Sequence, residues 1–443
     1  MPLDFSFSVS ELDFLTAQVG SNLSDGESLD WDKYIVKSSV NVESPVSVSS
    51  TKTLRPETSA QITDISARLI ETFTNPDKYV KFLAHRGDSA RDLLDLLQKL
   101  LDHAPIKPQF RVLLYVALVR LCRKSELCPR SFYLQGVSVQ DEYAHSAGYF
   151  GDIYKAYYKG KPVCLKVVKL YYKSDQSQYH KAFSREAVVW AQLSHPNVLP
   201  FYGIYFLNDR RKSFCLVSPW ISRGNVYEFL AEEPDANRPR LIYGIAAGME
   251  YLHENGVVHG DLKPLNILVA EPEQALLTDF GFSYVTDDHG LHSRNLSSAH
   301  APGGTRMYES PERLEGPESR RTRASDVFSF GMLFTHPPLA NVKTMSTATV
   351  HSKITHDPPQ PLQRITQYSS RALTDQMWQV MERCWSRNPN ARPTATMITR
   401  SLPPVDIKYV STELSLISRP GFDSLNGQVD DTIEKALRHL QSL

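Results

Sequence analysis

One segment constrains the fold and chemistry of this chain more than any other. Residues 257–269 read VVHGDLKPLNILV, two apolar runs around a loop that carries Asp261, Lys263 and Asn266 at fixed offsets. Short apolar runs predict buried strands, which would hold the polar loop between them in place. In such a loop Asp261 can orient a hydroxyl and accept its proton, Lys263 can offset phosphoryl charge, and Asn266 can bind a metal ion. The segment therefore predicts phosphoryl-transfer chemistry.

A second acidic position follows a short distance along the chain. Residues 276–281 read LLTDFG, which places Asp279 directly after an apolar run. A carboxylate at the end of a strand is a suitable ligand for Mg²⁺, which prefers oxygen ligands. We therefore expect Asp279 to supply the second metal ligand beside Asn266.

A lysine and a glutamate earlier in the chain form a candidate ion pair. Lys166 ends the apolar run VCLK, so its stem is buried and its ammonium needs a partner. Glu186 lies in the following helical segment and shares a face with Trp190. A Lys166–Glu186 pair would hold the ammonium toward the α- and β-phosphates of a nucleotide. The alternative is a surface lysine and a solvated glutamate.

A glycine-containing turn precedes that lysine. Residues 146–153 read SAGYFGDI and lead into a strand at 153–158, which residues 159–162 (KGKP) join to another at 163–168 as a hairpin. Gly148 and Gly151 would let backbone N–H groups approach phosphates, with Ser146 and Ile153 at the two ends. An ordinary glycine-containing hairpin is the alternative reading.

Length and charge limit the remaining possibilities. A chain of 443 residues is expected to form two or three domains. Its 49 basic residues equal its 49 acidic ones, so no overall charge favours nucleic acid or an anionic membrane. The apolar run 112–119 is too short to cross a bilayer, and the five cysteines show no CxxC spacing. We expect a cytoplasmic protein, with the nucleus not excluded.

The N-terminal part differs from the rest of the chain in its hydrophobic periodicity. Residues 1–56 lack sustained periodicity and are expected to be disordered. Residues 57–125 have helical periodicity, with Ser89 as a candidate cap of the second helix and Pro108 as a first-turn proline of a third. This helical region either packs against the next domain or binds a protein partner. Near the C-terminus, residues 430–443 are expected to form a short amphipathic helix.

Together, and in this order, the motifs resemble those of the eukaryotic protein kinase family. The resemblance extends from Tyr143 to about Arg400 and implies an α+β fold with a small β-rich N-lobe and a larger helical C-lobe. It implies ATP and Mg²⁺ as cofactors and a protein substrate. The family's catalytic residues map onto Lys166, Glu186, Asp261, Lys263, Asn266 and Asp279. Together with the regions described above, the expected domains are residues 1–56 (disordered), 57–125 (helical), 143–400 (kinase) and 401–443 (a tail with a short helix).

Further positions match the same family. Asp326 matches the aspartate that braces the catalytic loop, and Arg392 matches the arginine that pairs with Glu312. Residues 218–221 (SPWI) match the hinge between the lobes, with Ser218 at the gatekeeper position and Trp220 beside the adenine. The chain is similar to tyrosine-kinase-like kinases, notably those of mushroom-forming fungi. Lys263, two positions after Asp261, is typical of kinases that act on serine or threonine.

Three differences from the family's pattern leave a second functional hypothesis open. Ser146 replaces the first glycine of the phosphate loop, and Gly260 replaces the arginine before Asp261. After Asp326, the helix on which the catalytic core is anchored meets residues 336–338 (HPP) earlier than in relatives. A shortened anchor favours a pseudokinase, a folded signalling scaffold without catalysis. A small-molecule kinase is disfavoured by residues 304–305 and 310–312, which in the family shape a peptide-docking surface.

Overall fold

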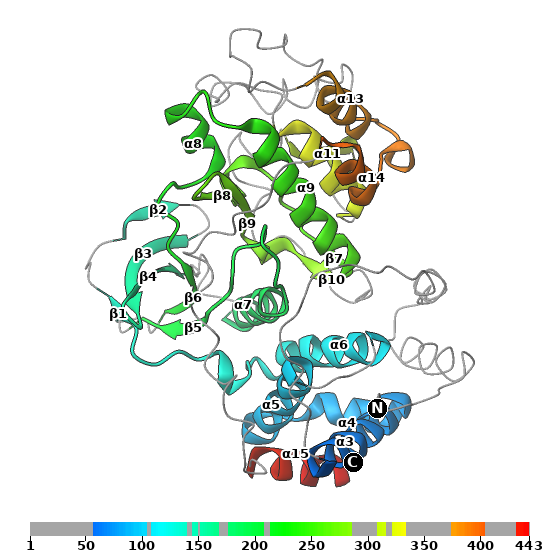
Figure 1. Cartoon of the computed structure of the whole chain (residues 1–443). Coiled ribbons are helices and arrows are strands. Elements are labelled where there is room, and N and C mark those ends of the chain that lie inside the picture. Colours follow the sequence, from blue (N-terminus) through cyan, green and yellow to red (C-terminus); the bar gives the residue numbers. More distant parts are fainter. Residues whose placement is uncertain are drawn as a thin grey trace. The chain divides into compact units, whose positions relative to one another are not determined.

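The computed structural model describes ten stretches of the chain: residues 56–103, 108–139, 144–148, 151–167, 176–207, 213–285, 308–315, 321–333, 374–403 and 431–442. They fall into two compact units (Figure 1). The first unit contains helices from the N-terminal part together with the C-terminal helix. The second contains the strands and the remaining helices. None of the described helices has the length and apolar composition needed to span a bilayer.

The described part of the first unit is built from helices. Its helices are α3 (Pro56–Thr74), α4 (Pro76–Ala84), α5 (Gly87–His103), α6 (Pro108–Ser125) and α15 (Asp431–Gln441). The sequence predicts three helices within residues 57–125, but the described residues 56–125 contain four, because Asn75 caps a new helix at Lys78 N and Pro76 occupies its first turn. Pro108 begins α6 as predicted. Ser89 does not cap α5, which starts two residues earlier at Gly87; its hydroxyl instead donates to Arg86 O.

Aromatic rings and the C-terminal helix contribute to the core of this unit. Phe73 packs edge-on against both Tyr79 and Phe82, with ring centroids 5.8 and 5.5 Å away. Helix α15, red in Figure 1, lies along α5 and α3 and buries Ala436 and Leu440. The C-terminal helix predicted for residues 430–443 is confirmed, and it packs in a bundle whose first described helix begins at Pro56, near the other end of the sequence.

The second unit begins with a curled antiparallel sheet. Its strand order is β1-β3-β4-β6-β5, and β2 pairs with the free part of β3. The strands are β1 (Ser138–Val139), β2 (Ser146–Gly148), β3 (Gly151–Tyr158), β4 (Lys161–Val167), β5 (Gly203–Phe206) and β6 (Phe214–Pro219). The hairpin predicted between β3 and β4 is confirmed: Lys159 and Gly160 both adopt positive φ, as a tight two-residue turn requires.

One helix accompanies this sheet, and a mainly helical lobe follows (Figure 1). Helix α7 (Gln176–Ala191) comes directly after β4 in the sequence of elements. The helical lobe contains α8 (Val226–Glu232), α9 (Arg238–Glu254), α10 (Pro311–Glu315), α11 (Arg323–Met332), α13 (Asp375–Cys384) and α14 (Ala395–Ser401). Two small sheets, β7 (Val257–Val258) with β10 (Tyr284–Val285) and β8 (Ile267–Ala270) with β9 (Gln274–Leu277), complete it.

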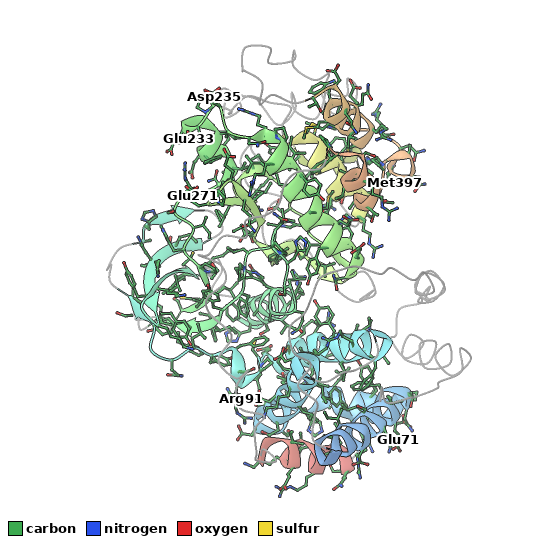
Figure 2. The ribbon with its side chains drawn as sticks, viewed as in Figure 1. Glu71, Arg91, Glu233, Asp235, Glu271 and Met397 are labelled. Carbon is green, nitrogen blue, oxygen red and sulfur yellow. The ribbon has the colours of Figure 1, made fainter. Side chains whose placement is uncertain are left out.

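The helical lobe is organised around α9. Leu241, Ile242, Ile245, Met249 and Leu252 of this helix are all buried, and β9 packs beside it. At the surface, Arg223 pairs with Glu233, which follows α8, and with Glu271; both glutamates are labelled in Figure 2. The predicted α+β fold with a β-rich N-lobe and a helical C-lobe is thus confirmed.

Several sequence predictions fall outside the described residues. These are the disordered region, of which only Pro56 is described, residues 304–305, and the length of the helix after Asp326 beyond Leu333. What the structure does describe of that helix is deeply anchored: every residue from Ser325 to Met332 is buried.

Candidate active site

Lys166 is the centre of an ion cluster in the N-lobe. Its Nζ donates to Glu186 Oε1 at 3.1 Å and to Asp279 Oδ1 at 2.7 Å. The three side chains come from β4, from α7 and from the segment that follows β9, and each is at most 16% exposed. The predicted Lys166–Glu186 pair is therefore present, and it includes Asp279 as well.

The sheet register explains where Lys166 lies. Ile153 of β3 pairs with Lys166 of β4, and Ser146 of β2 pairs with the same Ile153. On its other side Lys166 pairs with Leu216 of β6. Ser146, Ile153, Lys166 and Leu216 are therefore neighbours in one row across the sheet. Strands β2 and β3, which flank the glycine-containing turn, thus each place a residue in the row of the lysine. Tyr149 and Phe150, at the tip of that turn, lie outside the described residues.

Charge in this cluster favours the ammonium form. Burial disfavours a charged Lys166, but the carboxylates of Asp279 and Glu186 outweigh it and raise the pKa of Lys166. Burial raises the pKa of Glu186, partly opposed by Lys166, and the Asp279 charge adds to the rise. Burial alone would raise the pKa of Asp279, but the charge and hydrogen bond of Lys166 outweigh it, so the pKa of Asp279 lies below its ordinary value. Of the two carboxylates, Asp279 is thus the more firmly ionised, in keeping with its shorter distance to Nζ.

Asp261, Lys263 and Asn266 form a second cluster in the loop between β7 and β8. Lys263 Nζ donates to Asp261 Oδ2 at 2.6 Å, and Asn266 Nδ2 donates to Asp261 Oδ2 at 2.9 Å and to Asp261 O at 2.8 Å. All three residues are buried. Two donors thus fix one carboxylate oxygen of Asp261, which sets the orientation of the whole carboxyl group.

Asp326 at the start of α11 holds this loop from behind. Its Oδ1 accepts from Gly260 N at 2.8 Å, and its Oδ2 accepts from His259 N at 2.8 Å and lies 3.0 Å from His253 Nε2. The carboxylate is 2% exposed. Such charge-assisted bonds to buried N–H groups are strong, so the loop is fixed to a buried position near the start of α11.

Two hydrogen bonds connect the clusters. Thr278 N donates to Asn266 O at 3.0 Å, and His259 Nε2 lies 3.0 Å from Thr278 O. Asp261 N donates to His259 Nδ1, which leaves Nε2 as the protonated nitrogen that donates to Thr278. Asp279 follows Thr278 directly, so the Asp261 loop and the Asp279 position are joined through one residue.

A column of aromatic rings runs behind the site. Phe201 packs on Trp190, Trp190 on Phe280, and Phe280 on His259, with centroid separations of 5.3, 5.7 and 5.5 Å. We call these four residues the aromatic column. Trp190 Nε1 also donates to Leu199 O at 2.6 Å. The column connects α7 of the N-lobe with the loop that carries Asp261.

The proposed hinge residues lie at the end of β6. Ser218 of β6 is buried and pairs with Cys164 of the neighbouring strand β4. Trp220 N donates to Pro162 O at 3.2 Å, while its ring meets His145 edge-on at 4.8 Å and Lys155 Nζ at 5.2 Å. The main-chain N–H of Trp220 therefore has a partner, and the role predicted for Trp220 beside an adenine stays a prediction.

Sequence reasoning passed over two residues of this site. Arg185, next to Glu186, donates through Nη2 to Gly281 O at 2.5 Å and so connects α7 with the segment after Asp279. Burial raises the pKa of Cys164 to about 11, against a hydrogen bond with Ser218 and the charge of Lys166, so Cys164 is a neutral thiol. Cys164 lies two residues before Lys166, and residues two apart on a strand share a face. This spacing is visible in the sequence and could have pointed to Cys164.

The donor set suits a nucleotide with a hard cation. In the part of the chain that the structure describes, no three or more His, Cys, Asp or Glu side chains are grouped to hold a metal ion by themselves. Mg²⁺ is usually held by one or two protein oxygens together with substrate phosphates. Asn266 donates twice through its nitrogen, which leaves its side-chain oxygen as an acceptor, and Asp279 has a second carboxylate oxygen. These two residues fit that requirement.

Comparisons with known proteins agree with this geometry. The profile of the family described as protein tyrosine and serine/threonine kinase matches residues 143–402. The chain is 28% identical to the dual specificity protein kinase zakA of Dictyostelium discoideum, over 65% of this chain and 38% of zakA. It is 25% identical to the serine/threonine/tyrosine-protein kinase HT1 of Arabidopsis thaliana, over 67% of this chain and 74% of HT1.

A human kinase shows a comparable percentage of sequence identity to this chain. Receptor-interacting serine/threonine-protein kinase 1 of Homo sapiens is 28% identical over 56% of this chain and 38% of its own length. The matched region thus spans well under half of zakA and of this human kinase. The kinase profile nevertheless covers more than half of the present chain. The chain belongs to the eukaryotic protein kinase superfamily, within its tyrosine-kinase-like group.

Proposed function

We propose that this protein is an active protein kinase that transfers the γ-phosphoryl group of Mg²⁺-ATP to serine or threonine hydroxyls of a protein substrate. One observation carries the proposal: Lys166 Nζ contacts both Glu186 and Asp279, at 3.1 and 2.7 Å. In kinases the lysine–glutamate pair and the metal-binding aspartate must be in place together for phosphoryl transfer.

Each residue would have a distinct role. Asp261, whose carboxyl group is oriented by Lys263 and Asn266, would accept the proton of the attacking hydroxyl. Lys263 would offset the negative charge that develops on the transferred phosphoryl group, and Lys166 would hold the α- and β-phosphates. Asn266 and Asp279 would hold the metal ion, which neutralises phosphate charge when bound.

The nucleotide would be held by the N-lobe sheet. The backbone of residues 146–153, with Gly148 and Gly151 paired across the turn, would contact the phosphates, and Ile153 lies in the same row of the sheet as Lys166. Ser218 and Trp220 would flank the adenine at the end of β6. The preference for serine and threonine rests on Lys263 alone, because the relatives include a dual specificity kinase and a serine/threonine/tyrosine kinase.

The test compares phosphate incorporation by three purified full-length proteins. Wild type, Asp261→Asn and Asp235→Asn are incubated with Mg²⁺-ATP and a generic protein substrate. Asp235 is an exposed aspartate between α8 and α9 (Figure 2) and serves as the matched control. Asp261→Asn should lower the rate by about 10²- to 10⁴-fold, and Asp235→Asn should not. Acid hydrolysis of the labelled substrate then identifies phosphoserine, phosphothreonine or phosphotyrosine.

A second candidate function is a non-catalytic scaffold with a kinase fold. It is motivated by residues 336–338, which lie outside the described residues. Thermal stabilisation by Mg²⁺-ATP, together with equal and negligible phosphate incorporation by wild type and Asp261→Asn, would favour it. Phosphotyrosine as the main product would instead overturn the serine/threonine preference alone.

Three broader assignments also stay proposals. We propose the division of the chain into residues 1–56, 57–125, 143–400 and 401–443, a protein partner for the 57–125 region, and a cytoplasmic location. Limited proteolysis with mass spectrometry would test the domain boundaries, because linkers between compact domains are cleaved first.

A further inference from the structure

Phe132 extends the aromatic column at its outer end. It precedes the residues matched by the kinase profile, which begin at 143, yet among the described residues its side chain is one of the largest that are fully buried. Its ring meets Phe201 edge-on, with centroids 5.8 Å apart and planes at 77°. Edge-to-face pairs at this separation are attractive beyond the area that they bury. The column therefore has a fifth ring, supplied by a residue outside the recognised kinase motifs.

The backbone around Phe132 is fixed to the edge of the sheet. Leu134 N donates to Ile204 O at 2.8 Å, and Tyr133 forms a parallel bridge with Ile204 of β5. At Gly203 an added Cβ would come within 2.4 Å of Phe132 O, so only glycine permits this approach. The hydrogen bond, the bridge and the close approach at Gly203 thus fix the backbone of residues 132–134, and the Phe132 ring therefore has a defined position.

The column leads from Phe132 to the residue that pairs with Lys166. Phe201 contacts Trp190, which lies on α7 one helical turn after Glu186. Residues four apart on a helix share a face, so fixing Trp190 fixes the turn that carries Glu186. Glu186 Oε1 accepts from Lys166 Nζ at 3.1 Å. Two ring contacts thus separate Phe132 from the helix turn that sets this ion pair.

We propose that Phe132 is a positioning residue of this kinase: through Phe201 and Trp190 it holds α7 in the orientation in which Glu186 reaches Lys166. The proposal rests on the function proposed above. Removal of the ring leaves a cavity beside Phe201, and packed neighbours relax only partly into such a cavity. A small displacement of Trp190 then moves Glu186 away from Lys166.

The neighbouring Tyr133 provides a matched control. Its ring stacks on Phe206 at 5.6 Å with planes 4° apart, and Phe206 is 45% exposed. Tyr133 therefore contributes an aromatic contact from the same backbone segment but outside the column. Its ring path to α7 is longer than that of Phe132, with three ring contacts that run through the half-exposed Phe206 and through Phe214 to Phe183. A loss that came only from weakening this edge of the sheet would appear in both variants.

The experiment uses the full-length chain as wild type, Phe132→Ala, Phe132→Leu and Tyr133→Ala. The first measurement is kcat and KM for ATP, per folded molecule, with a generic protein substrate. The second is hydrogen exchange of α7, with α9 as the internal reference. Phe132→Ala should lower kcat by about 10- to 100-fold, change KM less, and speed exchange in α7 but not in α9. Phe132→Leu, which refills much of the volume, should restore most of kcat, and Tyr133→Ala should resemble wild type.

Two outcomes would overturn the proposal. One is a Phe132→Ala protein whose kcat and α7 exchange match those of Tyr133→Ala. The other, if Phe132→Ala does not fold, is a Phe132→Leu protein with slower turnover but unchanged α7 exchange. If wild type itself transfers no phosphate, the proposed function fails, while α7 exchange still decides whether Phe132 holds that helix. The two failures are therefore distinguishable.

Discussion

Arg392 and Glu312, 80 residues apart in the sequence, form an ion pair with two parallel hydrogen bonds of 2.8 Å each. The Arg392 side chain is fully buried. It also donates to Ala324 O and Ser386 O, and its guanidinium lies 5.1 Å from the Phe328 ring centroid. The pairing expected from the family resemblance is confirmed, and one side chain connects α10, α11 and the segment after α13.

Arg392→Lys should destabilise the protein although it keeps the charge. Lysine lacks the planar fork that makes both bonds to Glu312, and a single ammonium cannot reach the two carbonyl groups at the same time. We expect the free energy of unfolding to fall by about 2–4 kcal/mol, measured by urea denaturation. The exposed Arg400→Lys is the control, with a change within about 0.5 kcal/mol. Equal stability of the two variants would contradict the role given to Arg392.

The stabilising effect of Glu312 should disappear in acid. Burial raises the pKa of Glu312, but hydrogen bonds from Arg392 and neighbouring groups outweigh it, so the pKa lies below its ordinary value of 4.5. An acid with a lowered pKa in the folded state stabilises the protein above its unfolded pKa and loses that effect as pH falls through the folded pKa. The difference in unfolding free energy between wild type and Glu312→Gln should be constant near neutral pH and shrink below about pH 4.5. A difference that grows on acidification would refute this.

Lys166→Met should abolish most of the phosphotransfer. The substitution keeps the length of the side chain but leaves the carboxylates of Glu186 and Asp279 without their shared cation. We expect the rate to fall by about 10²- to 10³-fold, and the melting temperature to fall as well. Lys159→Met, in the exposed turn between β3 and β4, is the control and should retain wild-type rates. Comparable activity in both variants would remove Lys166 from the site.

Gly331→Ala should destabilise α11, against the usual trend for helices. Alanine normally stabilises a helix interior by about 1 kcal/mol relative to glycine. At this position the new Cβ would lie 2.6 Å from Trp385 Nε1 and 2.8 Å from Cys384 Cβ. Overpacking of this kind costs about 1–3 kcal/mol, so unfolding should occur at lower urea concentration. The double variant with Trp385→Phe should recover part of the loss; a gain in stability from Gly331→Ala alone would disprove the close packing.

Patterns of neighbouring residues anticipated much of the local structure. The β3–β4 turn at Lys159 and Gly160, the start of α6 at Pro108 and the helix near the C-terminus each follow from side chains within one or two turns of the backbone. The missed start of α4 at Asn75 and Pro76 was also visible locally. The kinase motifs are a further case, since their order along the chain identifies the residues of the site before any contact is known.

Only the tertiary structure brought distant segments together. Lys166 and Asp279 are 113 residues apart, and His439 of α15 lies 3.3 Å from Asp92 across 347 residues. Phe132 has no sequence signal that separates it from any other buried ring. Periodicity reports which face of an element is apolar, but not which other element covers that face, because that choice depends on the packing of the whole core. The sequence alone thus determined the family and the chemical groups of this protein, whereas packing decided which of those groups meet and what holds them in place.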